Sequence, residues 1–178
     1  SGEHIVSGIL CGRFHCDNVG FHIGHELVTI DFNAVLTAED VQEVELLANQ
    51  YIWEDHPIHV SWPSQAELDD LRYRSKKALS GAVRIVTWPE ADCCACCGTH
   101  VRSSGQVGCV KLISCQKFRE GVRIEMAAGG RALAYCNAIA QQNSQVSQLL
   151  SAKPTATAAA VERVQKELYT LRGRVAAL

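Results

Sequence analysis

The segment CCACCGTHV, residues 93–101, brings two kinds of metal ligand together within one turn. It places Cys96 and His100 four residues apart, with Gly98 between them to ease the turn. A thiolate and an imidazole at this spacing can bind one metal ion, and zinc is the usual metal for mixed sulfur and nitrogen ligands. Taken alone the pattern has moderate specificity, because cysteine-rich turns also occur as buried packing.

The first ten residues, SGEHIVSGIL, add a third candidate ligand. Apolar residues follow His4 at helical spacing, which predicts a helix over Gly2–Phe14. Helices that bind a metal commonly present two histidines at positions i and i+4, on one face. The partner of His4 is therefore expected one residue before Ser1, and a sequence that starts without methionine is expected to be part of a longer protein.

Together the two segments resemble the HxxxH and CxxxH motifs of the alanyl-tRNA editing proteins. These are free-standing relatives of the editing domain of alanyl-tRNA synthetase, which is shared more distantly with threonyl-tRNA synthetase. Further blocks of the chain are similar to the family's successive blocks, namely VGFHIGHELVTIDF (19–32), LTAEDVQEVELLANQYIWEDHPI (36–58), RIVTWPEADCCACCGTHVRSSGQVG (84–108) and GVRIEMAAGGRAL (121–133). The sequence departs from the family's pattern because it lacks the first histidine of HxxxH and the small all-β region that usually precedes that histidine.

The resemblance implies a site and a reaction. It implies that His4, Cys96 and His100 bind Zn²⁺, and that His22 and Thr99 line the amino-acid pocket. The implied reaction is the ATP-independent hydrolysis of the ester between a wrong amino acid, serine or glycine, and the terminal ribose of alanine tRNA. Such editing is needed because a small synthesis pocket cannot strongly exclude an isostere that adds one hydroxyl.

Composition limits the remaining possibilities. At 178 residues, of which 47% are hydrophobic, the chain can bury one core and carry a helical appendage. The net charge of −2 gives no global nucleic-acid signature, so RNA would be recognised locally. Nine cysteines, clustered beside a histidine, favour metal chemistry in a reducing compartment over disulfides. We therefore expect a cytoplasmic protein with no membrane-spanning segment.

The expected fold class is α+β, a mainly antiparallel sheet with flanking helices, as in the synthetase editing domain. Alternating strand patterns occupy residues 19–23, 26–32, 57–62, 82–87, 107–115 and 122–127. Thr37 caps a long amphipathic helix, and Ser64 caps a short one. The cysteines after residue 87 are expected in a turn. We assign residues 1–130 to the editing domain and residues 131–178 to a helical linker or coiled-coil segment.

Two surfaces are candidates for partners. The dense basic run Arg72, Arg74, Lys76 and Lys77 is either a solvated loop or a contact with tRNA phosphates. In the last segment, apolar residues recur at steps of three and four, at Val161, Val164, Leu168, Leu171, Val175 and Leu178. This seam predicts packing in a helical hairpin or across a homodimer.

Two rival functions remain open at this level. In one, the metal only stabilises the fold, and the module binds RNA or protein without catalysis. In the other, the helical seam drives assembly and the N-terminal part is inert. The helix-borne His4 together with the Cys96–His100 spacing favours editing over both. With one ligand of the pair expected before Ser1, the chain as printed is expected to hold zinc weakly and to edit poorly.

Overall fold

The computed structural model describes residues 1–75 and 81–177, which form two compact units, Ser1–Leu133 and Ala134–Leu178. The first unit contains antiparallel sheets with helices packed against them, and the second is helical. The expected α+β class is therefore confirmed. In the described part of the chain, no helix combines the length and the hydrophobicity that a membrane crossing requires.

A four-stranded antiparallel sheet forms one layer of the first unit. Its strands lie in the order β1-β2-β7-β6, with bounds Asn18–Ile23 (β1), Val28–Phe32 (β2), Gly121–Ala128 (β7) and Val110–Phe118 (β6). Residue 30 pairs with residue 124 across β2 and β7, so Ile30 and Ile124 share a face, and both are fully buried. That face supplies the sheet's half of the core.

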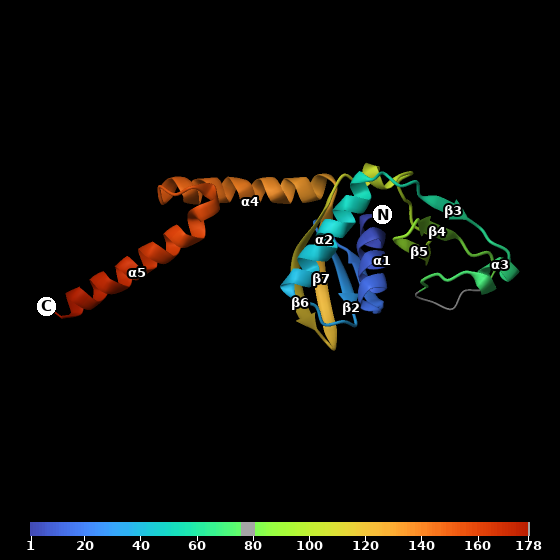
Figure 1. Cartoon of the computed structure of the whole chain (residues 1–178), viewed down its shortest axis with the longest axis horizontal. Coiled ribbons are helices and arrows are strands. Elements are labelled where there is room, and N and C mark those ends of the chain that lie inside the picture. Colours follow the sequence, from blue (N-terminus) through green and yellow to red (C-terminus); the bar gives the residue numbers. More distant parts are fainter. Residues whose placement is uncertain (76–80, 178) are drawn as a thin grey trace. The chain divides into compact units, whose positions relative to one another are not determined.

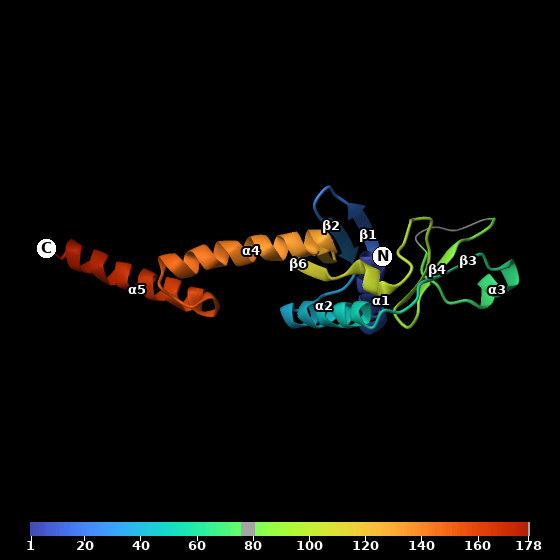
Figure 2. The same cartoon turned by 90° about the horizontal axis from the view of Figure 1, so that it is seen from above.

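Two helices, α1 (Gly2–Phe14) and α2 (Ala38–Trp53), cover this buried face (Figure 2). The bounds of α1 agree with the prediction from its apolar spacing. Thr37 begins α2 with the expected capping box, because its side chain accepts from the Asp40 backbone while Asp40 accepts from the Thr37 backbone. The side chains of both helices that pack on the sheet are Ile5, Val6, Leu10, Val44, Ala48, Tyr51 and Ile52.

A second, three-stranded sheet lies on the other side of α1, as Figures 1 and 2 both show. Its strands are β3 (His59–Ser61), β4 (Ile85–Trp88) and β5 (Asp92–Ala95), all antiparallel. The short helix α3 (Gln65–Asp70) packs against this sheet through Leu68, whereas the 3₁₀ turn η1 (Ser104–Val107) lies against α2, where Ser104 Oγ donates to the Tyr51 carbonyl.

The strand β5 corrects the expectation that residues after 87 form only a turn. Asp92–Ala95 pairs with β4, Cys93 facing Thr87 and Cys94 facing Val86. Asp92 and Cys94 are buried, whereas Cys93 and Ala95 are half-buried, so consecutive side chains point to opposite faces. The clustered cysteines are therefore separated by the pleat of a strand, and only those after Ala95 lie in a turn.

The second unit contains most of α4 (Gly130–Leu149), the 3₁₀ turn η2 (Pro154–Ala156) and α5 (Thr157–Ala176). Asn143 fixes the connection, since it donates to the Pro154 carbonyl and accepts from the Thr157 hydroxyl. Five residues of the predicted seam lie on α5 and remain largely exposed, from 38% at Val161 to 70% at Val175, and the sixth, Leu178, lies outside the described residues.

Candidate metal centre

His4 enters the site from the first turn of α1 with its orientation fixed. The imidazole Nδ1 donates to Asp92 Oδ2 at 3.0 Å. Arg74 donates to both oxygens of the same carboxylate, at 2.7 and 2.6 Å. Because Nδ1 carries the proton, the lone pair of a neutral imidazole lies on Nε2, where it is available to a metal.

Cys96 and His100 come from the loop that follows β5. Arg84 fixes this loop by donating to the carbonyls of Cys96 and Gly98, at 2.6 and 2.9 Å. The Gly98 amide points at Cys96 Sγ, 3.4 Å away, and His100 Nε2 lies 3.4 Å from the same sulfur. The loop therefore curves around Cys96 Sγ, so that the His100 imidazole lies beside this sulfur atom.

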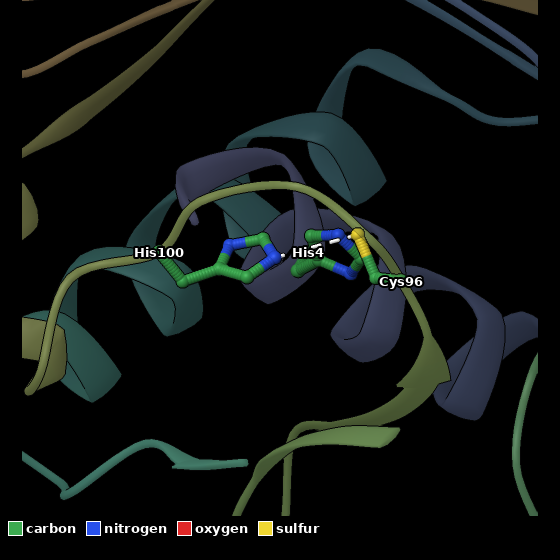
Figure 3. Close-up of side chains that lie close together, drawn as sticks. All are labelled: His4, Cys96 and His100. Atoms are coloured by element: carbon green, nitrogen blue, oxygen red, sulfur yellow. Dashed lines mark hydrogen bonds between the residues drawn. The ribbon is translucent and has the colours of Figure 1, made fainter. Parts of the chain in front are cut away.

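The structure brings His4, Cys96 and His100 into one cluster, with ligand atoms that all lie within 4.8 Å of one another (Figure 3). Trp88 supports both imidazoles from β4. Its indole stacks on His4 at 4.2 Å between ring centroids and meets His100 edge-on at 4.9 Å. Two imidazoles and one thiolate, held by side chains that leave Nε2 and Sγ facing each other, can hold a metal ion.

The electrostatics suit neutral imidazole ligands. Burial chiefly, with the chain's N-terminal charge, His4 and Arg84 adding to it, lowers the pKa of His100 to about 4. His100 is therefore neutral near pH 7, the state that binds a metal. Burial alone would raise the pKa of Asp92, but the hydrogen bonds from Arg74 and then His4 outweigh it and leave that pKa below its ordinary value.

A second group of possible ligands, His4, Asp92 and Cys94, lies on the Nδ1 side of the same imidazole. The carboxylate oxygens of Asp92 and the Nδ1 atom of His4 already form hydrogen bonds, because Asp92 accepts from Arg74 and from His4. Burial also raises the pKa of Cys94 to about 12, which keeps that thiol protonated. The Nε2 side, toward Cys96 and His100, is therefore the better metal position.

A cleft of about 440 Å³ opens beside His100. Thr99 lines it, as do Val107 and the backbone around Gly129. The predicted pocket residue Thr99 is thus exposed next to the cluster, on the loop that carries two of its ligands.

The remaining predicted residues lie elsewhere. His22 is exposed on the edge strand β1, opposite Thr29, and is not part of the cluster. Arg72 is exposed, whereas Arg74 turns inward to Asp92. The Arg74 backbone also bonds to β5, donating to the Cys93 carbonyl at 2.8 Å. The other two members of the basic run, Lys76 and Lys77, lie outside the described residues.

Sequence reasoning missed four residues that shape this site, Glu3, Arg84, Trp88 and Asp92. Glu3 and Asp92 each lie next to a residue that the motifs single out, so adjacency was a usable signal. No local sequence signal distinguishes Arg84 or Trp88. Their roles come from the pairing of β4 with β5 and from the packing of α1 on β4.

The sequence of this chain is similar to those of several known proteins. Residues 83–125, which contain Cys96 and His100, match the family described as the threonyl and alanyl tRNA synthetase second additional domain. The alanyl-tRNA editing protein Aarsd1-B of Xenopus laevis is 29% identical over 97% of this chain and 43% of its own length. The alanyl-tRNA editing protein AlaX-L of Pyrococcus horikoshii is 28% identical over 96% of this chain and 42% of its own length.

A synthetase also matches. The alanine–tRNA ligase of Methanothermobacter thermautotrophicus is 28% identical over 80% of this chain and 16% of its own length. The chain thus spans less than half the length of these relatives. The chain is therefore similar over most of its length to alanyl-tRNA editing proteins and, over residues 83–125, to the threonyl and alanyl tRNA synthetase second additional domain.

Proposed function

We propose that the protein hydrolyses the ester of mischarged alanine tRNA, with serine or glycine as the wrong amino acid. The observation that carries the proposal is the convergence of His4, Cys96 and His100 within 4.8 Å, in a chain related to alanyl-tRNA editing proteins. A folded module that needed a metal only for stability would not need a cleft beside its ligands. Here a cleft of about 440 Å³ adjoins His100.

We infer that the metal is zinc. The donor set of one thiolate and two imidazoles suits zinc better than magnesium or calcium, which prefer oxygen. These are three of the four protein ligands that the motifs predict, the fourth being the histidine expected one residue before Ser1, and three ligands with an open position already suit a catalytic zinc. Bound there, zinc would polarise the ester carbonyl, lower the pKa of a water, or orient the substrate. His4, Cys96 and His100 would hold it, and Asp92 would keep His4 Nε2 directed at it.

The chain's own residues supply the rest of the reaction site. Thr99, exposed on the cleft, offers a hydroxyl that can donate to or accept from the amino-acid part of the substrate. A polar wall of this kind selects serine over alanine, because only serine has a side-chain hydroxyl to pair with it. We also propose His22 as a pocket residue. It lies on the edge strand β1, and we propose that bound tRNA covers this strand.

Three wider proposals accompany this function. The tRNA would contact the basic run that begins at Arg72, whose exposed guanidinium can neutralise a phosphate. The helix α5 would pair with a second copy through its exposed seam. The cytoplasm would be the compartment, because a cysteine cluster that binds a metal needs reducing conditions.

The test is deacylation of serine-charged alanine tRNA, with alanine-charged tRNA as the control substrate. Cys96→Ala should abolish both activity and zinc, the latter measured by elemental analysis. Cys93→Ala is the matched control, because Cys93 lies in the same segment but faces the small core around Leu68 and Ile85. Equal losses in the two variants, or cleavage of both tRNAs at the same rate, would refute the proposal.

A further inference from the structure

Glu3 lies next to the metal position and has no role so far. It precedes His4 on α1, and its side chain is 12% exposed. One carboxylate oxygen, Oε1, accepts from Ser7 Oγ at 2.7 Å and from Asn18 Nδ2 at 2.8 Å. Asn18 Nδ2 also donates to Ser7 Oγ at 3.1 Å, which closes a ring of three side chains. The carboxylate is thereby fixed through one oxygen only.

The other oxygen, Oε2, faces the cluster. It lies 3.7 Å from His4 Nε2, the nitrogen left free for a metal by the hydrogen bond from Nδ1 to Asp92. Glu3 is not among the residues whose ligand atoms all lie within 4.8 Å of one another in that cluster. Its position therefore suits a group that contacts something bound at the metal position better than it suits a fourth ligand.

The charge of Glu3 also needs an explanation. A carboxylate that is mostly removed from water costs free energy unless a cation or hydrogen bonds compensate it. Across residues 1–75 and 81–177, no lysine or arginine forms an ion pair with Glu3, and its charged neighbours are the N-terminal ammonium of Ser1 and, when protonated, His4. In the same network Asn18 Oδ1 is buried without a hydrogen-bond partner among those residues.

We propose that Glu3 Oε2 orients the attacking water and accepts its proton, an inference that rests on the proposed function. As the water oxygen bonds to the ester carbonyl carbon, one of its protons passes to Oε2. The bond between that carbon and the ribose oxygen then breaks, and the ribose oxygen takes the proton back from Glu3. A glutamate beside a metal-binding histidine performs this task in the HExxH pattern, where it is the general base.

The decisive variant is Glu3→Gln, which keeps the shape and an acceptor for Ser7 and Asn18 but cannot take a proton. Its kcat for serine-charged alanine tRNA should fall by about 10²–10⁴-fold, the usual contribution of a general base. Its KM, and its zinc Kd from competition with a chromophoric chelator, should stay within about threefold of wild type. The control is Glu43→Gln, an exposed glutamate of α2 that pairs with Arg13, and it should change neither quantity.

A second arm separates proton transfer from structural support. Glu3→Ala opens space for a small carboxylate, so added formate should restore part of its kcat and should not help Glu3→Gln. Unchanged activity in Glu3→Gln would overturn the role of Glu3 and leave the editing proposal intact. Parallel losses of activity and zinc affinity would make Glu3 a ligand and overturn its role as base. A zinc-loaded wild-type protein that cleaves neither tRNA would overturn both inferences.

Discussion

At the scale of single residues, the two nitrogen atoms of His4 face different partners. Nδ1 donates to Asp92, and Nε2 faces the cluster. Arg74 holds the carboxylate in turn, so a chain of charged hydrogen bonds runs from a basic residue through Asp92 to the ligand. Such outer contacts fix the tautomer of a ligating histidine and raise its basicity.

Asp92→Asn should therefore weaken zinc binding by about 10–100-fold, the range typical for loss of such an outer partner. The variant can be measured by chelator competition and thermal unfolding. Asp31→Asn is a matched control. Arg123 donates to both carboxylate oxygens of Asp31, at 2.6 and 2.8 Å, as Arg74 does to Asp92, but this pair lies in the other sheet. Both variants should lose stability, but only Asp92→Asn should lose affinity for zinc. An equal loss of affinity would mean that Asp92 acts only through the fold.

The Asp31–Arg123 pair predicts how stability depends on pH. The hydrogen bonds from Arg123 hold the pKa of Asp31 below its ordinary value. Since the folded pKa is the lower one, the pair stabilises the protein above the unfolded pKa of about 3.9, and this contribution is lost as pH falls through the folded value. The wild type should exceed Asp31→Asn in unfolding free energy by up to about 1 kcal/mol at pH 7.

This difference should shrink as the pH falls below about 3.9, the unfolded pKa. Urea unfolding at pH 7, 5 and 3, with metal removed by a chelator, would follow it, and Asp70→Asn at the exposed end of α3 is the reference variant. A difference between wild type and Asp31→Asn that is the same at all three pH values would contradict the assignment.

At the scale of elements, the close approach of α1 to the turn before β5 sets the geometry of the site. Gly8 makes this approach possible. A Cβ atom there would collide with the Ala91 carbonyl oxygen and lie 2.6 Å from Asp92 Cβ. The glycine therefore lets the helix that carries His4 touch the segment that carries Asp92.

Gly8→Ala should destabilise the protein by about 1–3 kcal/mol, the usual effect of overpacking, because the obstacle is backbone and cannot rotate away. It should also lower zinc affinity by moving Asp92 away from His4. Gly12→Ala tests the opposite case on the same helix, since a Cβ there meets nothing within 4 Å. That variant should gain about 0.5–1 kcal/mol from helix propensity. Chemical denaturation of both variants would measure their free energies of unfolding. A Gly8→Ala variant more stable than wild type would refute the packing argument.

At the scale of the whole molecule, the second unit exposes the apolar residues that the sequence aligned in a seam. Leu168 is 46% exposed and Leu171 is 52% exposed. In proteins, most of the stability of a helix comes from packing its apolar face against another element. A second copy of α5 would provide that burial.

Replacing Leu168 and Leu171 by Asp should convert a dimer to a monomer and reduce the helical circular dichroism signal. Replacing Thr170 and Gly173 by Asp adds the same charge outside the seam and should leave the mass by light scattering unchanged. If the wild type is already monomeric, or if the Leu168 and Leu171 replacements change nothing, α5 does not associate through this seam.

Local patterns in the sequence by themselves determined several features of this protein. The apolar spacing after His4 predicted α1 with its bounds, and the helix caps predicted at Thr37 and Ser64 were confirmed. The α+β class also followed from strand alternation. These features depend on contacts between residues a few positions apart, where helical and strand periodicities act.

The surroundings of the ligands depend on contacts between segments that are distant in the sequence. The contact between His4 and Asp92 joins residues 88 positions apart, and the contact between Arg74 and Asp92 depends on where a loop docks against β5. The alternation of Asp92, Cys93 and Cys94 between two faces also required the partner strand β4. Such contacts carry no periodic signal, because they arise from the packing of distant segments. Residue types could therefore indicate a metal, while the orientation of each ligand needed the folded chain.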